Sequence, residues 1–266
     1  MSNNVLPKNV LLCPPTQYDL RYAINPWMLG QQVDKIKAVE EFDAIVEAYK
    51  TLGLKPQFIE QDDALPDMVF TANAGVMIGD IFIPSNFRYV ERQGESKLFA
   101  DYFERVGIKV EYIDESIIFE GAGDALFLGD TLVLGYGFRS MQETKTALLK
   151  YLPEDKILSL GLSNPYFYHL DTCFSPLPSG KFIYYPDAFD DQSRKLLEQL
   201  GGYWVTEDFC INYGCNMVAY GDTMLTSYVD ERIQEIADLE NLKIVQLPIN
   251  EFIKAGGGVR CLSFPY

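Results

Sequence analysis

The feature that most constrains the fold of this chain is a short pattern that recurs four times. Each time, a Gly-Asp or Ser-Gly dipeptide separates two β-rich runs, which is typical of the turn in a β-hairpin. The four patterns occupy residues 74–86, 124–136, 173–186 and 216–228. Their turns begin at residues 79, 129, 179 and 221, so the first three lie 50 residues apart and the fourth follows after 42. Such regular spacing predicts a repeat architecture.

Each hairpin is followed by a helical pattern and then by one more short strand. Apolar residues at helical spacing predict helices in residues 95–107, 190–202 and 229–242, and the second of these ends on two glycines, which favour a helix stop. The predicted buried faces comprise Leu98, Tyr102, Phe103 and Val106 in the first helix, and Leu196, Leu197 and Leu200 in the second. The third strands are expected at residues 109–113, 156–160, 203–206 and 243–247. The repeated unit is therefore strand–strand–helix–strand.

A fifth unit is split between the two ends of the chain. A strand at 9–15 leads to a helical pattern at 31–53 and a further strand at 55–60, but no hairpin precedes the helix. We expect a strand at 259–264 to supply the missing piece, so that both ends of the chain close one unit. No linker or low-complexity segment interrupts the pattern, which predicts a single domain of residues 1–266.

Composition excludes several classes of protein. The formal net charge is −16, whereas nucleic-acid binding requires a basic face. No apolar run approaches membrane-spanning length, and the first residues lack the basic region and cleavage site of a signal peptide. The chain has five cysteines, an odd number whose spacing suits neither a zinc site nor a disulfide framework. Reduced thiols in the cytoplasm are the expectation.

Polar side chains occur just before each predicted hairpin and in the closing segment. If the units pack around a common axis, equivalent positions converge on that axis, and these side chains meet in one central cleft. They are Asn73, Glu120, Asp124, His169, Asp171, Asn216 and Cys261.

The chemistry of these residue types predicts nucleophilic catalysis. A cysteine attacks as the thiolate, whose pKa must be lowered by a nearby cation or base. His169 is the only histidine of the chain, so any Cys–His catalysis involving Cys261 must use it. Glu120 and Asp171 can hold a cationic substrate by charge-assisted hydrogen bonds, preferably a planar one. Glycines such as Gly258 let the backbone before the cysteine adopt positive φ and pass close to a ligand.

Each of these residues also has a structural interpretation. A cysteine in a β-rich run is more often a small buried hydrophobe, and a lone histidine is more often hydrogen-bonded structure. Residues 123–124 and 221–222 are interpreted as turns or strand ends, and residues 24–28 as a tight turn with Trp27 buried. Cys13, Cys173, Cys210 and Cys215 are interpreted as structural. The matching positions in the repeat favour a shared site for the rest.

Four stretches of the chain resemble the guanidino-group-modifying, or pentein, superfamily. They are residues 66–75, 119–124, 169–171 and 256–265. The superfamily includes arginine deiminases, dimethylarginine dimethylaminohydrolases, amidinotransferases and arginine dihydrolases. The resemblance covers essentially the whole chain and implies a five-bladed α/β-propeller with its active site on the pseudo-fivefold axis.

The resemblance also implies roles for individual residues. Cys261 matches the nucleophile and His169 the acid/base of the superfamily, while Glu120 and Asp171 match carboxylates that grip the guanidinium. Two arginines match residues that bind the α-carboxylate of the substrate, although a surface ion pair of little energetic weight is the alternative for each. These are Arg92 and, as the looser match, Arg139.

One residue departs from part of the superfamily. Arginine deiminases and dimethylarginine enzymes resembling this chain carry an aspartate where this chain has Asn73. Bacterial arginine dihydrolases resemble this chain more closely, because they share its sequence motifs at residues 70–75, 119–124 and 24–28. The last of these motifs makes Asn25 a further candidate at the site. A carboxylate only accepts hydrogen bonds, whereas an amide also donates. Asn73 is therefore predicted to hold arginine and then the ureido group of citrulline for a second hydrolysis.

The predicted function is that of an arginine dihydrolase giving ornithine, ammonia and carbon dioxide without a metal or organic cofactor. Rivals with the same chemistry are an arginine deiminase or dimethylarginine dimethylaminohydrolase giving citrulline, and an amidinotransferase. Rivals of a different class are a non-catalytic binding protein of the same fold and a papain-type cysteine hydrolase. The expected partner is a small guanidino compound, with no nucleic acid and no membrane. Proteins of this fold often form dimers, so a homodimer or higher homo-oligomer is compatible with the resemblance.

Overall fold

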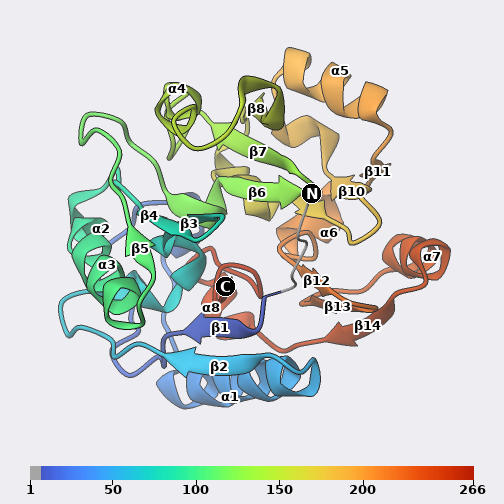
Figure 1. Ribbon diagram of the computed structural model, residues 1–266. Helices are drawn as coiled ribbons and strands as arrows, with labels where there is room; N and C mark the ends of the chain where they lie inside the picture. The colour runs from blue at the N-terminus through green and yellow to red at the C-terminus, as the bar shows by residue number, and fades with distance from the viewer. Residues whose placement is uncertain (1–6) are drawn as a thin grey trace.

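The computed structural model describes residues 7–266, which form a mixed α/β fold with five three-stranded sheets. Figure 1 shows the sheets arranged around a central region. In chain order, the sheets comprise β15 (Phe264–Pro265), β1 (Asn9–Leu12) and β2 (Lys55–Phe58); β3 (Gly75–Ile78), β4 (Ile81–Pro84) and β5 (Lys109–Val110); β6 (Ala125–Leu128), β7 (Thr131–Tyr136) and β8 (Ile157–Gly161); β9 (Phe174–Pro176), β10 (Phe182–Tyr184) and β11 (Tyr203–Trp204); and β12 (Val218–Tyr220), β13 (Thr223–Thr226) and β14 (Lys243–Gln246).

All five sheets are built in the same way. The first two strands of a sheet pair antiparallel and the third pairs parallel to the middle strand. The four predicted hairpins are confirmed, and each turn contains a glycine with φ between 58° and 84°, namely Gly79, Gly129, Gly180 and Gly221. The left-handed conformation is unstrained for glycine alone, which explains the recurring residue.

The fifth sheet joins the two ends of the chain, as the sequence predicts. Tyr266 and Asn9 exchange backbone hydrogen bonds of 2.9 and 3.0 Å. The C-terminal strand is shorter than expected, because only Phe264–Pro265 is a strand and Cys261 lies in a turn. The backbone N–H of Cys261 bonds to a side chain instead of a neighbouring strand, so the ladder cannot extend to it.

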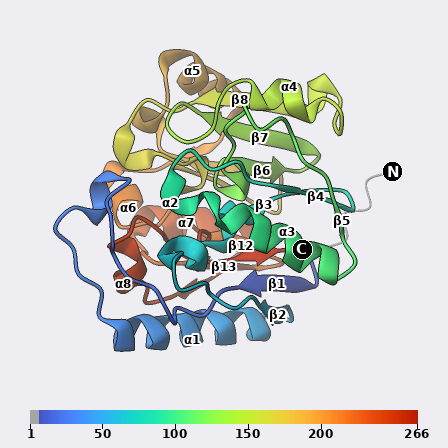
Figure 2. The ribbon, with the colours of Figure 1, turned by 90° about the vertical axis from the view of Figure 1, so that its left-hand side faces the viewer.

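Helices cover the outer sides of the sheets. They are α1 (Lys35–Thr51), α3 (Glu95–Arg105), α4 (Thr144–Leu148), α5 (Asp191–Leu200) and α7 (Glu231–Glu240). Figure 2 shows α1 running along the outside of the β1–β2 sheet. In α5, Asp190 caps the first turn by accepting from Ser193 N, and Gly201 ends the helix at φ 73°. Such caps satisfy backbone groups that a helix leaves free at its ends.

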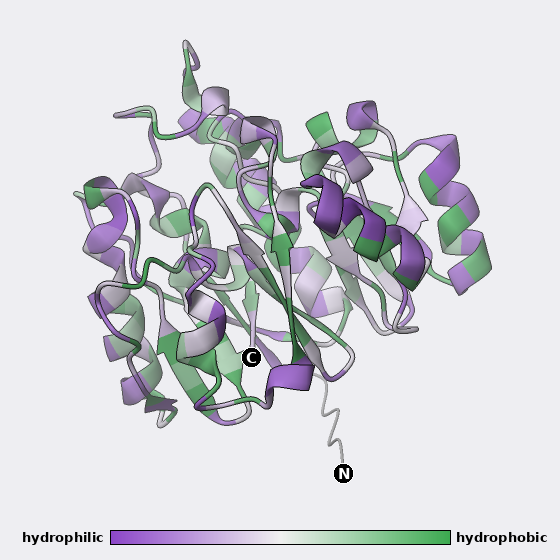
Figure 3. Ribbon diagram, turned by 90° about the horizontal axis from the view of Figure 1, so that it is seen from above, coloured by the Kyte–Doolittle hydropathy of each residue, from purple (hydrophilic) through white to green (hydrophobic). Residues whose placement is uncertain are grey.

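The predicted apolar faces are confirmed in part, since Leu98 and Leu196 are only half-buried. Phe103 and Leu197 are fully buried, whereas Val106 and Leu200 are 45% and 47% exposed. Leu200 is the last residue of α5, and Val106 directly follows α3. Figure 3 shows apolar strands inside and polar helix faces outside. Burial of these strands supplies the main stabilisation of the fold.

Short 3₁₀ segments precede the hairpins and lie toward the centre. They are η3 (Thr71–Ala74), η4 (Gly121–Gly123) and η7 (Leu170–Thr172), and η4 packs against both others. Three further short helices are α2 (Val90–Gln93), α6 (Glu207–Ile211) and α8 (Asn250–Ile253). Within residues 7–266, every helix is too short or too polar to cross a membrane.

Candidate active site

A closed pocket at the centre of the molecule brings together most of the predicted site residues. It encloses about 10 Å³ of free space, close to the room that one water molecule needs. Its lining comprises Ile24, Asn25, Met28, Asp67, Phe70, Asn73, Arg92, Arg139, Tyr168, His169, Ala255, Gly256 and Cys261. Glu120 and Asp171 lie directly behind this lining, where they contact His169 and Cys261 respectively.

The turn that carries Cys261 is fixed by hydrogen bonds to two distant segments. The carbonyl of Cys261 accepts from Ala72 N at 3.0 Å, and its N–H donates to Asn216 Oδ1 at 3.1 Å. The Sγ atom donates to Asp171 Oδ2 at 3.4 Å and accepts from Asn216 Nδ2 at 3.1 Å. The thiol therefore has a defined position between a carboxyl and an amide.

The three glycines before the cysteine are required by close packing. A Cβ at Gly257 would lie 2.1 Å from the Phe70 ring, and one at Gly258 would lie 2.6 Å from Asn216 Oδ1. Gly256 has φ 83°, so the predicted positive φ is confirmed there. The predicted close approach of this backbone was to a ligand, whereas the close approaches at Gly257 and Gly258 are to the side chains of Phe70 and Asn216.

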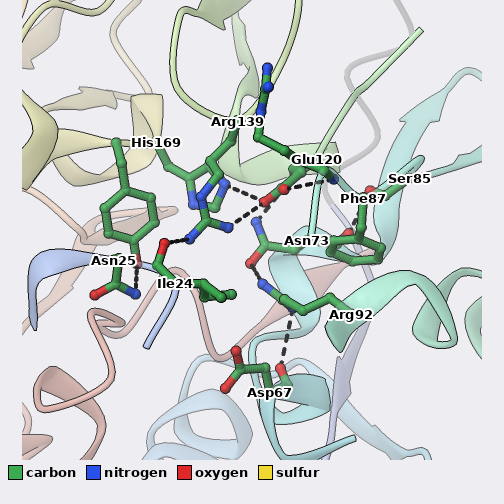
Figure 4. A network of polar contacts seen from close by, with 12 residues as sticks. Ile24, Asn25, Asp67, Asn73, Ser85, Phe87, Arg92, Glu120, Arg139 and His169 are labelled. Atoms are coloured by element: carbon green, nitrogen blue, oxygen red, sulfur yellow. Dashed lines mark hydrogen bonds and ion pairs between the residues drawn. The ribbon is translucent and has the colours of Figure 1, made fainter. Parts of the chain in front are cut away.

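A buried charge network connects His169, Glu120 and Arg139, as Figure 4 shows. Glu120 Oε2 lies 2.9 Å from His169 Nε2 and accepts from Arg139 Nη1 at 2.9 Å. Its other oxygen accepts from Arg88 N at 3.2 Å. Burial by itself raises the pKa of Glu120, but the charge of Arg139 and the bond to His169 outweigh it and hold the pKa well below its usual range. Glu120 is therefore an ionised carboxylate that orients His169.

Asp171 is as deeply buried as Glu120 but is not paired with a cation. Its Oδ1 has no hydrogen-bond partner among residues 7–266. Burial raises its pKa to about 7, against the more distant charge of Arg260 and the bond from Cys261. Burial and the Asp171 carboxylate together raise the pKa of the Cys261 thiol. Within residues 7–266, no cationic side chain forms an ion pair with Asp171 or a hydrogen bond with Cys261 Sγ, although the charge of Arg260 acts on Asp171.

The two predicted arginines lie in the pocket but differ in their free hydrogen-bonding capacity. Arg92 donates through Nε and Nη2 to Glu95, through Nη1 to Asn73 Oδ1 and through Nη2 to Asp67 O, which leaves one of its five N–H groups unused. Arg139 donates one bond to Glu120 and one to Ile24 O, which leaves three. Neither arginine is the surface ion pair of the alternative interpretation, because both are 3% exposed.

The guanidinium of Arg139 lies between two tyrosine rings. Its central carbon lies 4.7 Å from the ring centre of Tyr89 and 4.6 Å from that of Tyr168. Cation–π contacts of this kind favour arginine over lysine. The sandwich fixes the guanidinium at the wall of the pocket.

The side-chain amides of the two predicted asparagines, Asn73 and Asn25, each donate and accept hydrogen bonds. Asn73 donates through Nδ2 to Glu120 O at 3.2 Å and accepts from Arg92 Nη1 at 3.0 Å. Asn25 donates to Ala255 O at 2.9 Å and accepts from Trp27 N at 2.9 Å, so it caps the short 3₁₀ turn η1 (Pro26–Met28). The predicted tight turn is thus present, with Trp27 only half-buried. Asn73 keeps one N–H for a ligand, whereas the second N–H of Asn25 donates to Tyr168 Oη at 3.3 Å.

Asp67 is a pocket residue that the sequence analysis did not single out. It is 2% exposed, and its Oδ1 has no hydrogen-bond partner among the described residues. Burial raises its pKa, opposed chiefly by the charge of Arg92. It lies in the same 66–75 stretch as Asn73, six residues earlier, and an acidic residue beside that motif was the available signal. The sequence analysis did not single out Tyr168 either, and its position directly before His169 was the available signal.

Asp124 acts as a brace behind the pocket. Its carboxylate accepts from Leu170 N at 3.0 Å and from Ser140 Oγ at 2.6 Å, and Ser140 Oγ in turn accepts from Glu120 N at 3.0 Å. Asp124 directly precedes β6, in agreement with its interpretation as a strand-end residue. The four other cysteines are fully or almost fully buried and lie outside the pocket lining, in agreement with a structural role.

Comparisons with known proteins place the chain among guanidino-modifying enzymes. A family model for eukaryotic N,N dimethylarginine dimethylhydrolase matches residues 14–144. The chain is 38% identical over 262 residues to the bifunctional arginine dihydrolase/ornithine cyclodeaminase ArgZ of Synechocystis sp., covering 96% of this chain but only 37% of ArgZ. It is 32% identical over 255 residues to the N(G),N(G)-dimethylarginine dimethylaminohydrolase of Mycobacterium tuberculosis, covering 95% of this chain and 83% of that protein.

Crystal structures of the N-terminal domain of ArgZ from cyanobacteria are similar throughout. A cysteine-to-serine variant bound to substrate superposes with a TM-score of 0.92 at 37% identity, covering 97% of both chains. An asparagine-to-serine variant covalently bound to a reaction intermediate gives the same TM-score and coverage. The chain thus spans just over a third of the length of full ArgZ but nearly all of this domain.

Proposed function

Because this chain belongs to the dimethylarginine dimethylaminohydrolase-like family of guanidino-modifying enzymes, we propose that it is an arginine dihydrolase that acts through a cysteine nucleophile. The observation that carries the proposal is the pocket itself, where Cys261 and the His169–Glu120 pair lie near carboxylates that each have one oxygen without a hydrogen-bond partner among residues 7–266. Two such carboxylates, on Asp171 and Asp67, fit the two cationic groups of arginine. The ArgZ domain, of 37% identity, supports arginine as the substrate.

In the proposed reaction the substrate activates its own nucleophile. The guanidinium binds between Asp171 and Glu120 and supplies the positive charge that the Cys261 thiol lacks. The thiol then loses its proton to solvent, and the thiolate adds to the guanidinium carbon. His169, held by Glu120, protonates the leaving ammonia and then takes a proton from the water that attacks the covalent intermediate. Citrulline and one ammonia result.

A second cycle on citrulline gives ornithine, a second ammonia and carbon dioxide. Citrulline is neutral at its ureido group, so a residue that donates to the carbonyl is required to keep it bound. Asn73 lines the pocket and keeps one unused N–H, and Asn25, which also lines the pocket, can donate to a ligand by giving up its 3.3 Å bond to Tyr168 Oη. We assign both to holding the ureido group.

The other end of the substrate is assigned to Arg139 and Asp67. Arg139 has three unused N–H groups for the α-carboxylate, and Arg92 has one. The partner-free Asp67 oxygen offers a site for the α-ammonium group. The pocket encloses about 10 Å³ in this structure, so its wall, which includes Ile24, Asn25 and Met28, must open for arginine to bind.

We interpret the five sheets as the blades of an α/β-propeller with pseudo-fivefold symmetry, and residues 1–266 as one catalytic domain. Gly258 is not among the residues that line the pocket, and its assignment to substrate binding depends on its close approach to Asn216, which bonds to Cys261. A second candidate function, dimethylarginine dimethylaminohydrolase, is supported by the M. tuberculosis relative. It predicts release of citrulline and dimethylamine from dimethylarginine.

Product analysis tests the proposal. We expect purified protein with L-arginine to give ornithine and two ammonia per arginine consumed, measured by mass spectrometry and an ammonia assay. Cys261→Ser serves as the control and should abolish turnover without changing the circular dichroism spectrum. Citrulline with one ammonia would contradict the second cycle and the role of Asn73. Turnover of dimethylarginine but not arginine would establish the second candidate instead.

A further inference from the structure

A bulky residue with strained backbone lies beside the pocket. Tyr213 has φ 58° and is 1% exposed. A left-handed conformation is rare for such a residue and persists only where the surroundings enforce it. The other positive-φ residue that is not glycine within 7–266 is Asn241, at the end of α7, where this conformation is common. The turn at Tyr213 positions Asn216, whose N–H donates to Tyr213 O at 3.1 Å.

Asn216 is attached to the Cys261 segment at three points. Its Oδ1 accepts from Cys261 N at 3.1 Å, its Nδ2 donates to Cys261 Sγ at 3.1 Å, and its backbone carbonyl accepts from Arg260 N at 3.2 Å. The second N–H of Nδ2 donates to Asp171 O at 3.0 Å. Both N–H groups of the fully buried amide are thus in use.

The orientation of this amide is determined by its surroundings. If nitrogen and oxygen were exchanged, the amide nitrogen would face the N–H of Cys261 and the oxygen would face the carbonyl of Asp171. Both contacts would then be repulsive. Gly258 leaves room for this amide, because a Cβ at that position would lie 2.6 Å from Oδ1.

Building on the proposed function, we propose that Asn216 is a further catalytic residue, whose side-chain N–H stabilises the Cys261 thiolate. A hydrogen bond to an ionised acceptor is stronger than one to a neutral acceptor, so this donor favours the charged sulfur over the thiol. It supplies stabilisation beside Asp171, which has no ion-pair partner among the described residues. The guanidinium of the substrate then adds to an effect that is already present.

Several charged or titratable groups surround the Cys261 thiol. Asp171 faces it directly and opposes ionisation, while the hydrogen bonds from Asn216 and the Gly258 backbone favour it. The remaining titratable groups nearby, on the adjoining segments or the pocket wall, are Asp67, Arg92, Arg139, Tyr168, His169, Tyr213 and Arg260. All of them are retained in variants of Asn216, so a change in ionisation of the thiol reports on the amide.

The test is the pH dependence of Cys261 alkylation by iodoacetamide, followed through the tryptic peptide 261–266. We expect Asn216→Ala to move the alkylation profile upward by about 1–2 pH units, the value of one charge-assisted hydrogen bond. Asn216→Asp should move it further, because it removes the donor and adds a negative charge. The corresponding loss in kcat/KM for arginine is about 10- to 100-fold, with KM little changed.

A matched control is Asn86→Asp. The Asn86 amide also donates two bonds, to Asp114 O and Ile117 O at 3.1 Å each, but far from Cys261 in the chain. It should leave the alkylation profile unchanged. Circular dichroism of each variant checks folding.

Two outcomes would overturn the proposal. If Asn216→Ala alkylates with the wild-type pH profile, the donor does not stabilise the thiolate. If Asn216→Asp has wild-type kcat while Asn216→Ala is slow, Asn216 only positions Cys261 N through Oδ1, since the aspartate keeps that acceptor. Because alkylation needs no turnover, the comparison still decides the matter if no guanidino compound is hydrolysed, which would refute the proposed function alone.

Discussion

Two carboxylates at the back of the same pocket, Glu120 and Asp171, have opposite electrostatics. They are 0% and 1% exposed. Arg139 and His169 hold the pKa of Glu120 well below its usual range, whereas burial raises that of Asp171 to about 7. Burial is common to both, so the difference comes from the partners. One half of the pocket is balanced by ion pairs within the protein, whereas Asp171 has no ion pair among the described residues and meets a cationic ligand only in the proposed function.

The largest expected effect comes from removing the charge in the balanced half. Glu120→Gln keeps the shape of the side chain but leaves the buried Arg139 guanidinium without its counter-charge. We expect a loss of about 3–5 kcal/mol in the free energy of unfolding, together with loss of turnover. Urea unfolding and arginine hydrolysis measure the two effects.

The control for this change is Glu47→Gln, which removes an exposed carboxylate paired with Lys50. Its cost should be below about 1 kcal/mol. Equal stabilities of Glu120→Gln and Glu47→Gln would show that Arg139 does not depend on Glu120. The first half of the comparison would then be wrong.

The opposite sign is expected at Asp171. Between about pH 4 and pH 7 the folded protein keeps a proton on this carboxyl that the unfolded chain has lost, so wild-type stability falls as pH rises. Asp171→Asn removes this dependence. The variant should match wild type near pH 4 and exceed it by about 2–4 kcal/mol at pH 8, although turnover is lost.

Urea unfolding of both proteins at pH 4 and pH 8 checks this prediction. Glu120 should show the reverse pH dependence, because its pKa is lower in the folded protein than in the unfolded chain. Its contribution to stability is therefore present above the pKa of the unfolded chain and is lost as the pH falls. A variant at Asp171 that is less stable than wild type at pH 8 would mean that the carboxylate has a partner in solution.

The sequence allowed the repeat to be predicted because its signals are local. Each hairpin turn needs one residue with positive φ, which the sequence shows as a glycine. Each helical face is visible from the spacing of its apolar residues alone. The convergence of Asn73, Glu120, His169 and Cys261 followed from matching positions in the repeat. The short strand at 264–265 was not predictable, because a side chain 45 residues away takes the N–H of Cys261.

The electrostatic difference within the pocket was also beyond the sequence. Glu120 and Asp171 were given one shared role, because both are carboxylates in matching motifs. Which of them is neutralised depends on where Arg139 folds, and its guanidinium reaches Glu120 from 19 residues away in the chain. The lack of a partner at Asp67 is likewise a property of packing, since its neighbour Arg92 directs Nε and Nη2 to Glu95.

The smallest expected effect sharpens the comparison at Arg139 itself. Arg139→Lys keeps the positive charge near Glu120 but loses the planar contact with Tyr89 and Tyr168 and the bond to Ile24 O. If charge alone balances this half of the pocket, stability should fall by only about 1–2 kcal/mol, well short of the Glu120→Gln loss. KM for arginine should rise, because a lysine cannot bind a carboxylate through two parallel N–H groups. Arg194→Lys, at an exposed site beside Asp187, should change neither quantity measurably. A loss at Arg139→Lys as large as that at Glu120→Gln would place the balance in the shape of the guanidinium, and not in its charge.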